Sequence, residues 1–179
     1  MLNYEKLIVG QMRTNCYLVW NDDKEAVVID PGDEGEFICE EIERRQLRLK
    51  GILLTHKHFD HIGALEYLQL IYKIPNPSPL GELGASPFDP PAGRAGERDT
   101  KIFDFEVIET PGHTRDSVCF YSPSLGVVFT GDTLFKDLPT RNENLASIKK
   151  LMKLPEETIV LPGHDEDTTI WLESKRYDF

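Results

Sequence analysis

The chain has 179 residues, of which 20 are lysine or arginine and 31 are aspartate or glutamate, so its formal net charge is −11 at pH 7. With 40% hydrophobic and 28% charged residues, its composition is that of a globular protein, and we expect residues 1–179 to form a single domain. The acidic balance argues against nucleic acid and acidic membrane surfaces as partners, because binding to phosphate requires clustered lysine and arginine.

The first part of the chain alternates apolar runs with turn-forming segments. This pattern predicts strands at residues 6–9, 16–20 and 26–29. Residues 34–48 carry apolar side chains at helical spacing, with acidic residues early and arginines late, as the helix macrodipole favours, and therefore predict an amphipathic helix. The apolar run 51–55 predicts a buried strand that leads directly into His56.

The second part predicts a similar alternation after a long irregular segment. A helix is expected to follow residue 62 and to end at Pro75, and residues 75–96 are expected to form a loop, because prolines and glycines are dense there. We expect this loop to be a surface excursion or, alternatively, a lid or binding loop. The elements expected beyond it are strands at 102–108, 118–121, 127–130 and 158–161 and helices at 145–152 and 168–176.

Strands dominate both parts of the chain, and helices flank them in each. This arrangement favours an α/β protein with two sheets packed face to face, helices outside, and two similar halves. The amino-terminal residues lack a basic stretch followed by an apolar one, and no apolar run approaches about 18 residues, so we expect a cytoplasmic protein.

Cysteine and tryptophan are expected to serve packing. The odd number of cysteines in a chain without an export signal argues against a disulfide framework. We therefore expect Cys16, Cys39 and Cys119 to be reduced core residues. Trp20 and Trp171 are likewise expected to pack rather than to bind ligands.

The densest chemical signal lies in residues 55–61, where three imidazoles and a carboxylate fall within six positions. Neutral imidazole and carboxylate are ligands that suit zinc, iron or manganese near pH 7. His56 and His58 can point the same way from an extended segment, while Asp60 and His61 follow as the chain turns into a helix. Two adjacent metal positions are therefore within reach of this one segment.

Three strand ends farther along carry matching residues. His113 and His164 each follow Pro-Gly after an apolar run, and Asp132 follows Gly131 after another. A glycine lets the backbone approach a metal site closely. A carboxylate can bridge two cations, which a monodentate imidazole cannot, although Asp132 taken alone favours a helix N-cap or turn role.

Taken in order, Thr-His-x-His-x-Asp-His, Gly-His, Gly-Asp-Thr and Gly-His resemble the motifs of the metallo-β-lactamase-fold hydrolases over nearly the whole chain. The resemblance implies a four-layer αββα sandwich with the site at one edge between the sheets. It implies two divalent metal ions, with zinc expected first and iron or manganese as alternatives. The implied ligands are His56, His58 and His113 for the first ion, Asp60, His61 and His164 for the second, and Asp132 as the bridge.

Within this family, the chain most resembles the single-domain glyoxalase II-like hydrolases. His58 stands where flavodiiron relatives are expected to carry glutamate, and Asp132 stands where one β-lactamase subclass has cysteine, so both branches are disfavoured. Residues 165–179 are too few for the helical glutathione-binding domain of full-length glyoxalase II, and residues 134–141 lack the Gly-Arg-x-Asp element frequent in relatives.

The resemblance implies hydrolysis of an ester-like bond in a small molecule, in particular a thioester of the S-2-hydroxyacylglutathione type, by a hydroxide that bridges the metal ions. Asp60 and Asp132 would be the catalytic residues, because they fix the nucleophile through the metals and can relay a proton. Lys136 or Arg141 can hold an anionic substrate group, although solvated side chains are the expectation for both.

Three alternatives remain open. The first is a persulfide dioxygenase with one iron ion bound by His56, His113 and Asp132. The second is a hydrolase of lactones or other esters with the same fold. The third is a non-catalytic metal-binding or signalling module.

Overall fold

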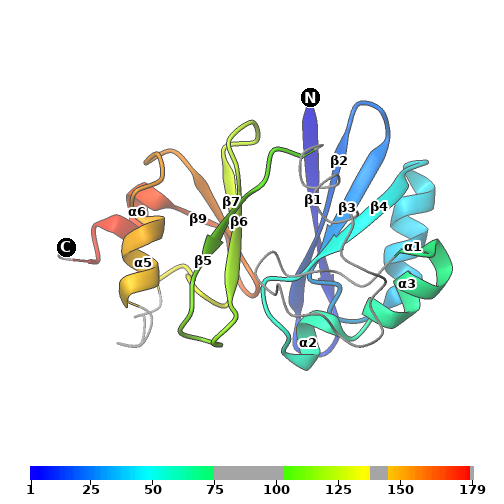
Figure 1. Ribbon diagram of the computed structural model, residues 1–179, viewed down its shortest axis with the longest axis horizontal. Helices are drawn as coiled ribbons and strands as arrows, with labels where there is room; N and C mark the ends of the chain where they lie inside the picture. The colour runs from blue at the N-terminus through cyan, green and yellow to red at the C-terminus, as the bar shows by residue number, and fades with distance from the viewer. Residues whose placement is uncertain (75–102, 138–144, 178–179) are drawn as a thin grey trace, which may run out of the picture.

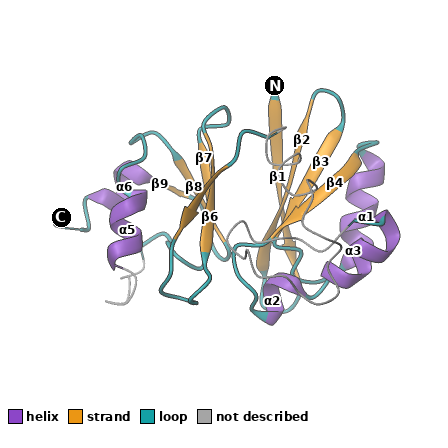
Figure 2. Ribbon diagram, in the orientation of Figure 1, coloured by secondary structure: helices purple, strands orange, loops and turns teal. Residues whose placement is uncertain are grey.

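The computed structural model describes residues 1–74, 103–137 and 145–177. Two β-sheets lie face to face in the middle of the molecule, and helices cover the outer face of each sheet (Figures 1 and 2). The chain therefore has the four-layer αββα arrangement that its sequence predicts.

The first sheet has the strand order β1-β2-β3-β4. The pairs β1–β2 and β2–β3 are antiparallel, whereas β3 and β4 are parallel and are joined by α1. Two further helices, α2 and α3, follow β4. The elements of this half are β1 (Leu2–Val9), β2 (Thr14–Asn21), β3 (Glu25–Ile29), α1 (Gly35–Arg44), β4 (Arg48–Leu53), α2 (Phe59–Ile62) and α3 (Leu65–Tyr72).

The second sheet has the order β5-β6-β7-β8-β9 and repeats the same succession of pairs. Its first two pairs are antiparallel, and the third, β7–β8, is parallel, with α5 in the connection. An antiparallel strand, β9, is added at the end. The expectation of two similar halves is thus confirmed. The elements are β5 (Glu106–Glu109), β6 (Val118–Ser122), β7 (Val127–Gly131), α5 (Leu145–Leu151), β8 (Ile159–Pro162), β9 (Thr168–Thr169) and α6 (Ile170–Ser174).

Alternate residues of the central strands enter different cores, because successive side chains of a strand point to opposite faces. In β2, Cys16 and Leu18 pack in the core that includes α1 and α3, whereas Tyr17 and Val19 pack in the core between the sheets. The Tyr17 ring lies 5.0 Å from that of Phe129 in β7, which joins the two sheets. Both faces of these strands are buried, which explains their nearly unbroken apolar sequences.

The first helix is shorter than the expected span 34–48. It ends at Arg44, because Gln46 adopts a left-handed conformation (φ 57°) and the Leu47 amide bonds back to the Ile42 carbonyl at 3.0 Å. These are features of a Schellman C-cap. Arg48 then opens strand β4 instead of closing the helix.

The carboxyl-terminal helix is also shorter than the expected span 168–176. Thr168 and Thr169 form strand β9, which pairs with β8. The helix α6 starts only at Ile170, where the side chain of Thr169 accepts a hydrogen bond from the Leu172 amide and caps it. The strand expected at 102–108 is likewise displaced, since β5 begins at Glu106.

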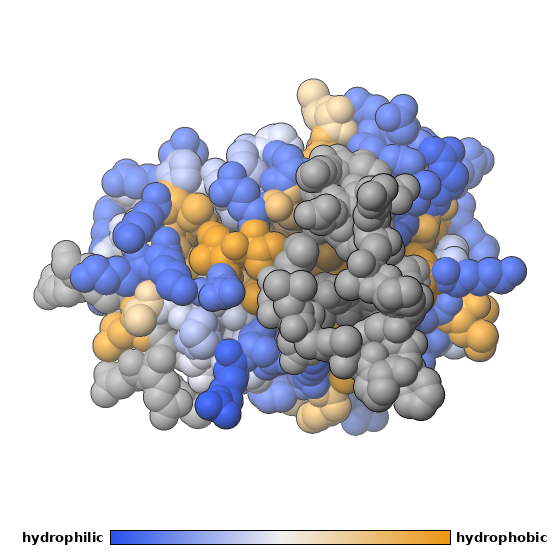
Figure 3. All heavy atoms as spheres, viewed as in Figure 1, coloured by the Kyte–Doolittle hydropathy of each residue, from blue (hydrophilic) through white to orange (hydrophobic). Residues whose placement is uncertain are grey.

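The surface in the view of Figure 3 carries apolar side chains over the strands of the second sheet, with polar and charged groups around them. Across residues 1–74, 103–137 and 145–177, no helix combines the length and the apolar composition needed to cross a bilayer.

Candidate metal centre

The segment after β4 delivers four of the predicted ligands. The chain leaves β4 at Leu53 and reaches α2 through His58, which is extended at the N-cap position (φ −66°, ψ 148°). The amide of His61 then donates to the His58 carbonyl at 2.9 Å, which forms the first turn of α2. A strand, an extended link and one helical turn thus direct the side chains of a short segment toward two neighbouring places.

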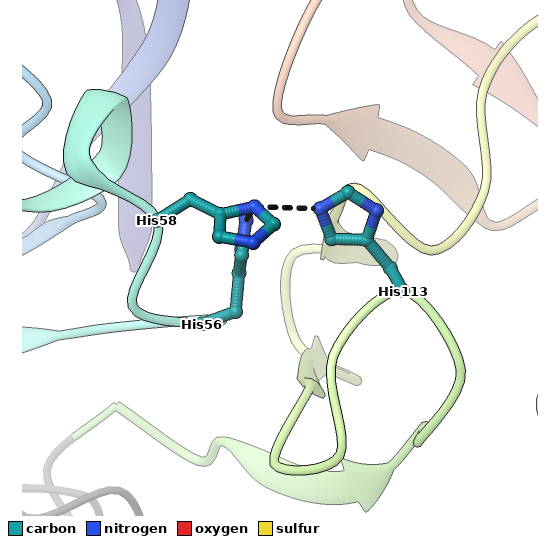
Figure 4. Close-up of side chains that lie close together, drawn as sticks. All are labelled: His56, His58 and His113. Atoms are coloured by element: carbon teal, nitrogen blue, oxygen red, sulfur yellow. Dashed lines mark hydrogen bonds between the residues drawn. The ribbon is translucent and has the colours of Figure 1, made fainter.

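The first place is formed by His56, His58 and His113, here called group one, whose ligand atoms lie within 4.8 Å of one another. His58 Nδ1 lies 3.1 Å from His56 Nε2 and 2.9 Å from His113 Nε2. Figure 4 shows the rings of His58 and His113 facing each other from the two halves of the molecule.

The second place is formed by Asp60, His61 and His164, here called group two. Asp60 Oδ2 lies 3.1 Å from His164 Nε2 and 3.7 Å from His61 Nε2. Like group one, it combines residues of the first half with one residue from the turn after a strand of the second.

Asp132 lies between the two groups. Its Oδ1 is 3.3 Å from Nε2 of His61, and its Oδ2 is 3.4 Å from Nε2 of His113. Gly131, which ends β7, places it there with a left-handed conformation (φ 48°), and a Cβ on Gly131 would collide with the side chain of Thr55. One carboxylate thus presents one oxygen to each group.

The residues of this centre fit divalent metal ions. His61 Nε2 and Asp132 Oδ1 are buried without a hydrogen-bond partner, although buried polar atoms are ordinarily satisfied. A Cβ on Gly163 would lie 2.5 Å from Asp132 Oδ1, so the glycine leaves room for the carboxylate. Imidazole nitrogens and carboxylate oxygens form the donor set, which suits zinc, iron and manganese.

The surroundings of the two buried histidines, His56 and His61, shift their pKa values in opposite directions. Burial, reinforced by the neighbouring His61, lowers the pKa of His56 to about 4, so this imidazole is neutral at pH 7. Burial also acts to lower the pKa of His61, but the carboxylates of Asp132 and Asp30 outweigh it and raise that pKa to about 10. For Asp132, burial acts to raise the pKa, but His61 and the other nearby histidines lower it overall, which favours the ionised carboxylate.

Asp30 is a functional residue that the sequence analysis missed. It follows β3, is buried, and adopts a left-handed conformation (φ 52°). Its Oδ2 lies 3.0 Å from His61 Nδ1, and its two oxygens accept hydrogen bonds from the amide and the hydroxyl of Thr55 at 2.7 and 2.6 Å. Asp30, His56 and His61 also converge as a third candidate ligand group, but both oxygens of Asp30 already accept hydrogen bonds from Thr55, so we assign it an orienting role. The sequence did contain a signal for Asp30, because a carboxylate follows an apolar strand there, as it does at Asp132.

Two basic residues were considered for substrate binding. Lys136 forms an ion pair with Glu166 at the surface, which agrees with a solvated role. Arg141 lies outside the described residues, as do the rest of residues 138–144 and the loop 75–96.

The structure shows where the cysteine and tryptophan side chains pack. Cys16, Cys39 and Cys119 are free and buried, as expected. Trp20 packs against the core of the first half. Trp171 is 45% exposed, and the ammonium group of Lys175 lies over its ring at 3.1 Å from the ring centre, so this side chain packs at the surface rather than in a core.

Comparison with known proteins gives the same family as the motifs. Residues 9–164 match the model of the metallo-β-lactamase superfamily. The probable metallo-hydrolase YqgX of Bacillus subtilis is 34% identical over 99% of this chain and 97% of its own length. The hydroxyacylglutathione hydrolase GloC of Haemophilus influenzae is 33% identical over 99% of this chain and 98% of its own. These alignments span 206 and 207 positions, so both relatives carry insertions relative to this chain.

Solved structures agree. The B3 metallo-β-lactamase BLEG-1 superposes with a TM-score of 0.78 and 34% identity, covering 97% of each chain. TTHA1623 in a di-iron-bound form gives a TM-score of 0.73 and 32% identity, covering 96% of this chain and 97% of its own. The chain therefore belongs to the metallo-β-lactamase superfamily and is a metal-dependent hydrolase.

Proposed function

We propose that this hydrolase cleaves thioesters of the S-2-hydroxyacylglutathione type with two divalent ions, one at each ligand group. The observation that carries the proposal is the position of Asp132, which offers one carboxylate oxygen to each group. A further support is GloC, which is named a hydroxyacylglutathione hydrolase and aligns with this chain over nearly its whole length.

The ions, when bound, supply Lewis acidity toward the carbonyl and a hydroxide nucleophile at neutral pH. The chain itself supplies orientation. His56 is neutral and offers its nitrogen without losing a proton, while the lowered pKa of Asp132 keeps that carboxylate ionised. Asp60 is held by the Thr14 hydroxyl, 3.4 Å from its Oδ2, and we propose that it and Asp132 can relay a proton. A thiolate leaves readily, so the site needs no strong general acid.

We propose zinc as the ion, with iron and manganese as alternatives, because imidazole nitrogens and carboxylate oxygens can bind all three. The di-iron form of TTHA1623 supports testing iron first among the alternatives.

A dioxygenase with a single iron ion is the competing proposal, with His56, His113 and Asp132 as its ligands. In that proposal, no ion binds at group two. The buried His61 Nε2, which has no hydrogen-bond partner and lies 3.7 Å from Asp60 Oδ2, would then have no ion to satisfy it. We therefore favour the two-ion site.

The test is to load the stripped protein separately with Zn²⁺, Fe²⁺ and Mn²⁺, count bound ions by mass spectrometry, and assay a panel of substrates. The panel contains S-lactoylglutathione, an aryl ester, a lactone, glutathione persulfide with oxygen uptake, and a β-lactam, because BLEG-1 is named a β-lactamase. We expect two ions per chain and the highest kcat/KM on S-lactoylglutathione. One iron ion with oxygen uptake, or turnover of only the β-lactam, ester or lactone, would overturn the proposal.

A further inference from the structure

The turn that carries His164 belongs to the second half but is held by a strand of the first. The backbone amide of Asn15, in β2, donates to the Gly163 carbonyl at 2.7 Å. The Asn15 side-chain amide donates to the carbonyls of Pro162 and Asp165, at 2.9 and 3.0 Å. Asn15 therefore donates three hydrogen bonds to backbone carbonyls on both sides of His164.

A second residue of β2, Tyr17, also forms a hydrogen bond to this turn. The hydroxyl of Tyr17 donates to the Pro162 carbonyl at 2.7 Å, so this oxygen accepts from both Tyr17 and Asn15. Both side chains are almost fully buried, with exposed fractions of 2% and 1%. Buried donors of this kind keep a fixed geometry, because each would lose a hydrogen bond if the turn moved.

The turn needs such support for two reasons. Asp165 adopts a left-handed conformation (φ 64°), which a residue with a side chain seldom adopts without help from its surroundings. Gly163 passes so close to Asp132 and His61 that a shift of the turn would alter the geometry between them. The side chain of His164 is 20% exposed, so the backbone of this turn helps to fix where its imidazole lies.

Group one has a different support. His56 and His58 lie on the segment that follows β4, and the Thr55 carbonyl there accepts from the Val118 amide at 2.9 Å. The hydrogen bonds described for Asn15 and Tyr17 all go to residues 162–165. Asn15 and Tyr17 therefore support the turn that supplies a candidate ligand to group two.

We propose that Asn15, assisted by Tyr17, is a positioning residue that sets the affinity of group two for its metal ion while leaving group one unchanged. The inference rests on the proposed function only in requiring a second ion. Neither residue belongs to a ligand group, and both act through the backbone of the His164 turn.

The experiment compares Asn15→Ala, Asn15→Asp and Tyr17→Phe with the wild-type chain. Asn15→Asp keeps the shape but turns an oxygen toward two carbonyls, and Tyr17→Phe removes one hydroxyl with the least risk to folding. Ser122→Ala is the matched control, since Ser122 is fully buried and donates at 2.8 Å to Asp104 away from the centre. Stripped protein is titrated with Zn²⁺ against a chromophoric chelator, and melting temperatures of the stripped proteins are recorded in parallel.

We expect the second equivalent of Zn²⁺ to bind at least about tenfold more weakly in Asn15→Ala, more weakly still in Asn15→Asp, and by a smaller factor in Tyr17→Phe. The first equivalent should bind as in wild type, and Ser122→Ala should change neither. Equal weakening of both equivalents, or a lower melting temperature with unchanged binding of both, would overturn the proposal and leave Asn15 a structural residue. A wild-type chain that binds only one ion would overturn it as well. If wild type binds two ions but hydrolyses no thioester, only the proposed substrate fails.

Discussion

Asp30 Oδ2 lies 3.0 Å from Nδ1 of His61, on the side of the imidazole away from the Nε2 that faces Asp60 and Asp132. A carboxylate in this position accepts the proton of Nδ1 and so presents the lone pair of Nε2 to a metal ion. Carboxylate partners of this kind commonly orient histidine ligands.

Replacing Asp30 with asparagine should weaken both metal binding and folding. An amide accepts less strongly from His61 and Thr55, so the affinity for the second equivalent of Zn²⁺ should fall by about 10- to 100-fold and the free energy of unfolding by about 1–3 kcal/mol. Asp104→Asn is the control, because Asp104 also has a positive φ and accepts from Ser122 and Ser124. Unaltered Zn²⁺ affinity in Asp30→Asn, measured by competition with a chelator, would contradict the orienting role.

The high pKa of His61 makes loading of group two dependent on pH. In the metal-free protein this ring is protonated at pH 7, since its pKa is about 10, and it must release its proton before Nε2 can bind an ion. The affinity for the second equivalent should therefore rise about tenfold per pH unit between pH 7 and 9, from this group alone. Calorimetry in buffers of different ionisation enthalpy should detect the released proton, and an affinity independent of pH would rule out this account.

The same group predicts how the stability of the stripped protein varies with pH. The folded pKa of His61 is raised above its unfolded value near 6.5, so the folded state binds the extra proton in the window between 6.5 and about 10. The stabilisation is complete below pH 6.5 and is lost as the pH rises through 10. Urea denaturation of the stripped protein at pH 6.5, 8 and 10 should show a falling contribution from His61, and Asp30→Asn should reduce it.

His58 provides the most direct test of the ligand assignment. His58→Ala should remove the nitrogen that lies near both His56 and His113 and lower kcat/KM by at least about a hundredfold, with loss of the first equivalent of metal. Lys57→Ala is the neighbouring control, because Lys57 points to Asp116 at 3.8 Å, and its metal content should match wild type. A change of only a few-fold in His58→Ala would count against the two-ion hydrolase.

Gly163 should tolerate no side chain. In Gly163→Ala the added Cβ would lie 2.5 Å from Asp132 Oδ1 and 2.6 Å from His61 Cε1, so ligands must shift and metal should be lost. Gly126→Ala is the control for a glycine substitution without a steric clash, since Gly126 has φ 67° and no atom within 4 Å of the added Cβ. That control should lose about 1 kcal/mol of stability and keep its metal. Full metal content in Gly163→Ala would contradict this prediction and show that Asp132 and His61 can move enough to accommodate the added methyl group.

The convergence of the candidate ligand residues could be predicted from sequence, because metal chemistry restricts residue types and because four of the candidates lie in one short segment. The role of Asp30 could not, since it depends on β3 lying beside β4 with Ile29 opposite Leu53, a pairing between distant residues. The end of α1 could not be predicted either, because the left-handed position that ends such a helix is usually a glycine and here is Gln46. Strand β9 exists only because β8 lies next to it, and two threonines alone do not specify a strand.

The chain keeps its halves separate: β1 through α3 form one, and β5 through α6 form the other. Each ligand group nevertheless takes two residues from the first half and one from the second. A polypeptide divided between residues 74 and 103 would yield two fragments that hold incomplete versions of both groups. An ion bound at either group would connect the two fragments, so we expect metal binding at both groups to require that the two halves associate.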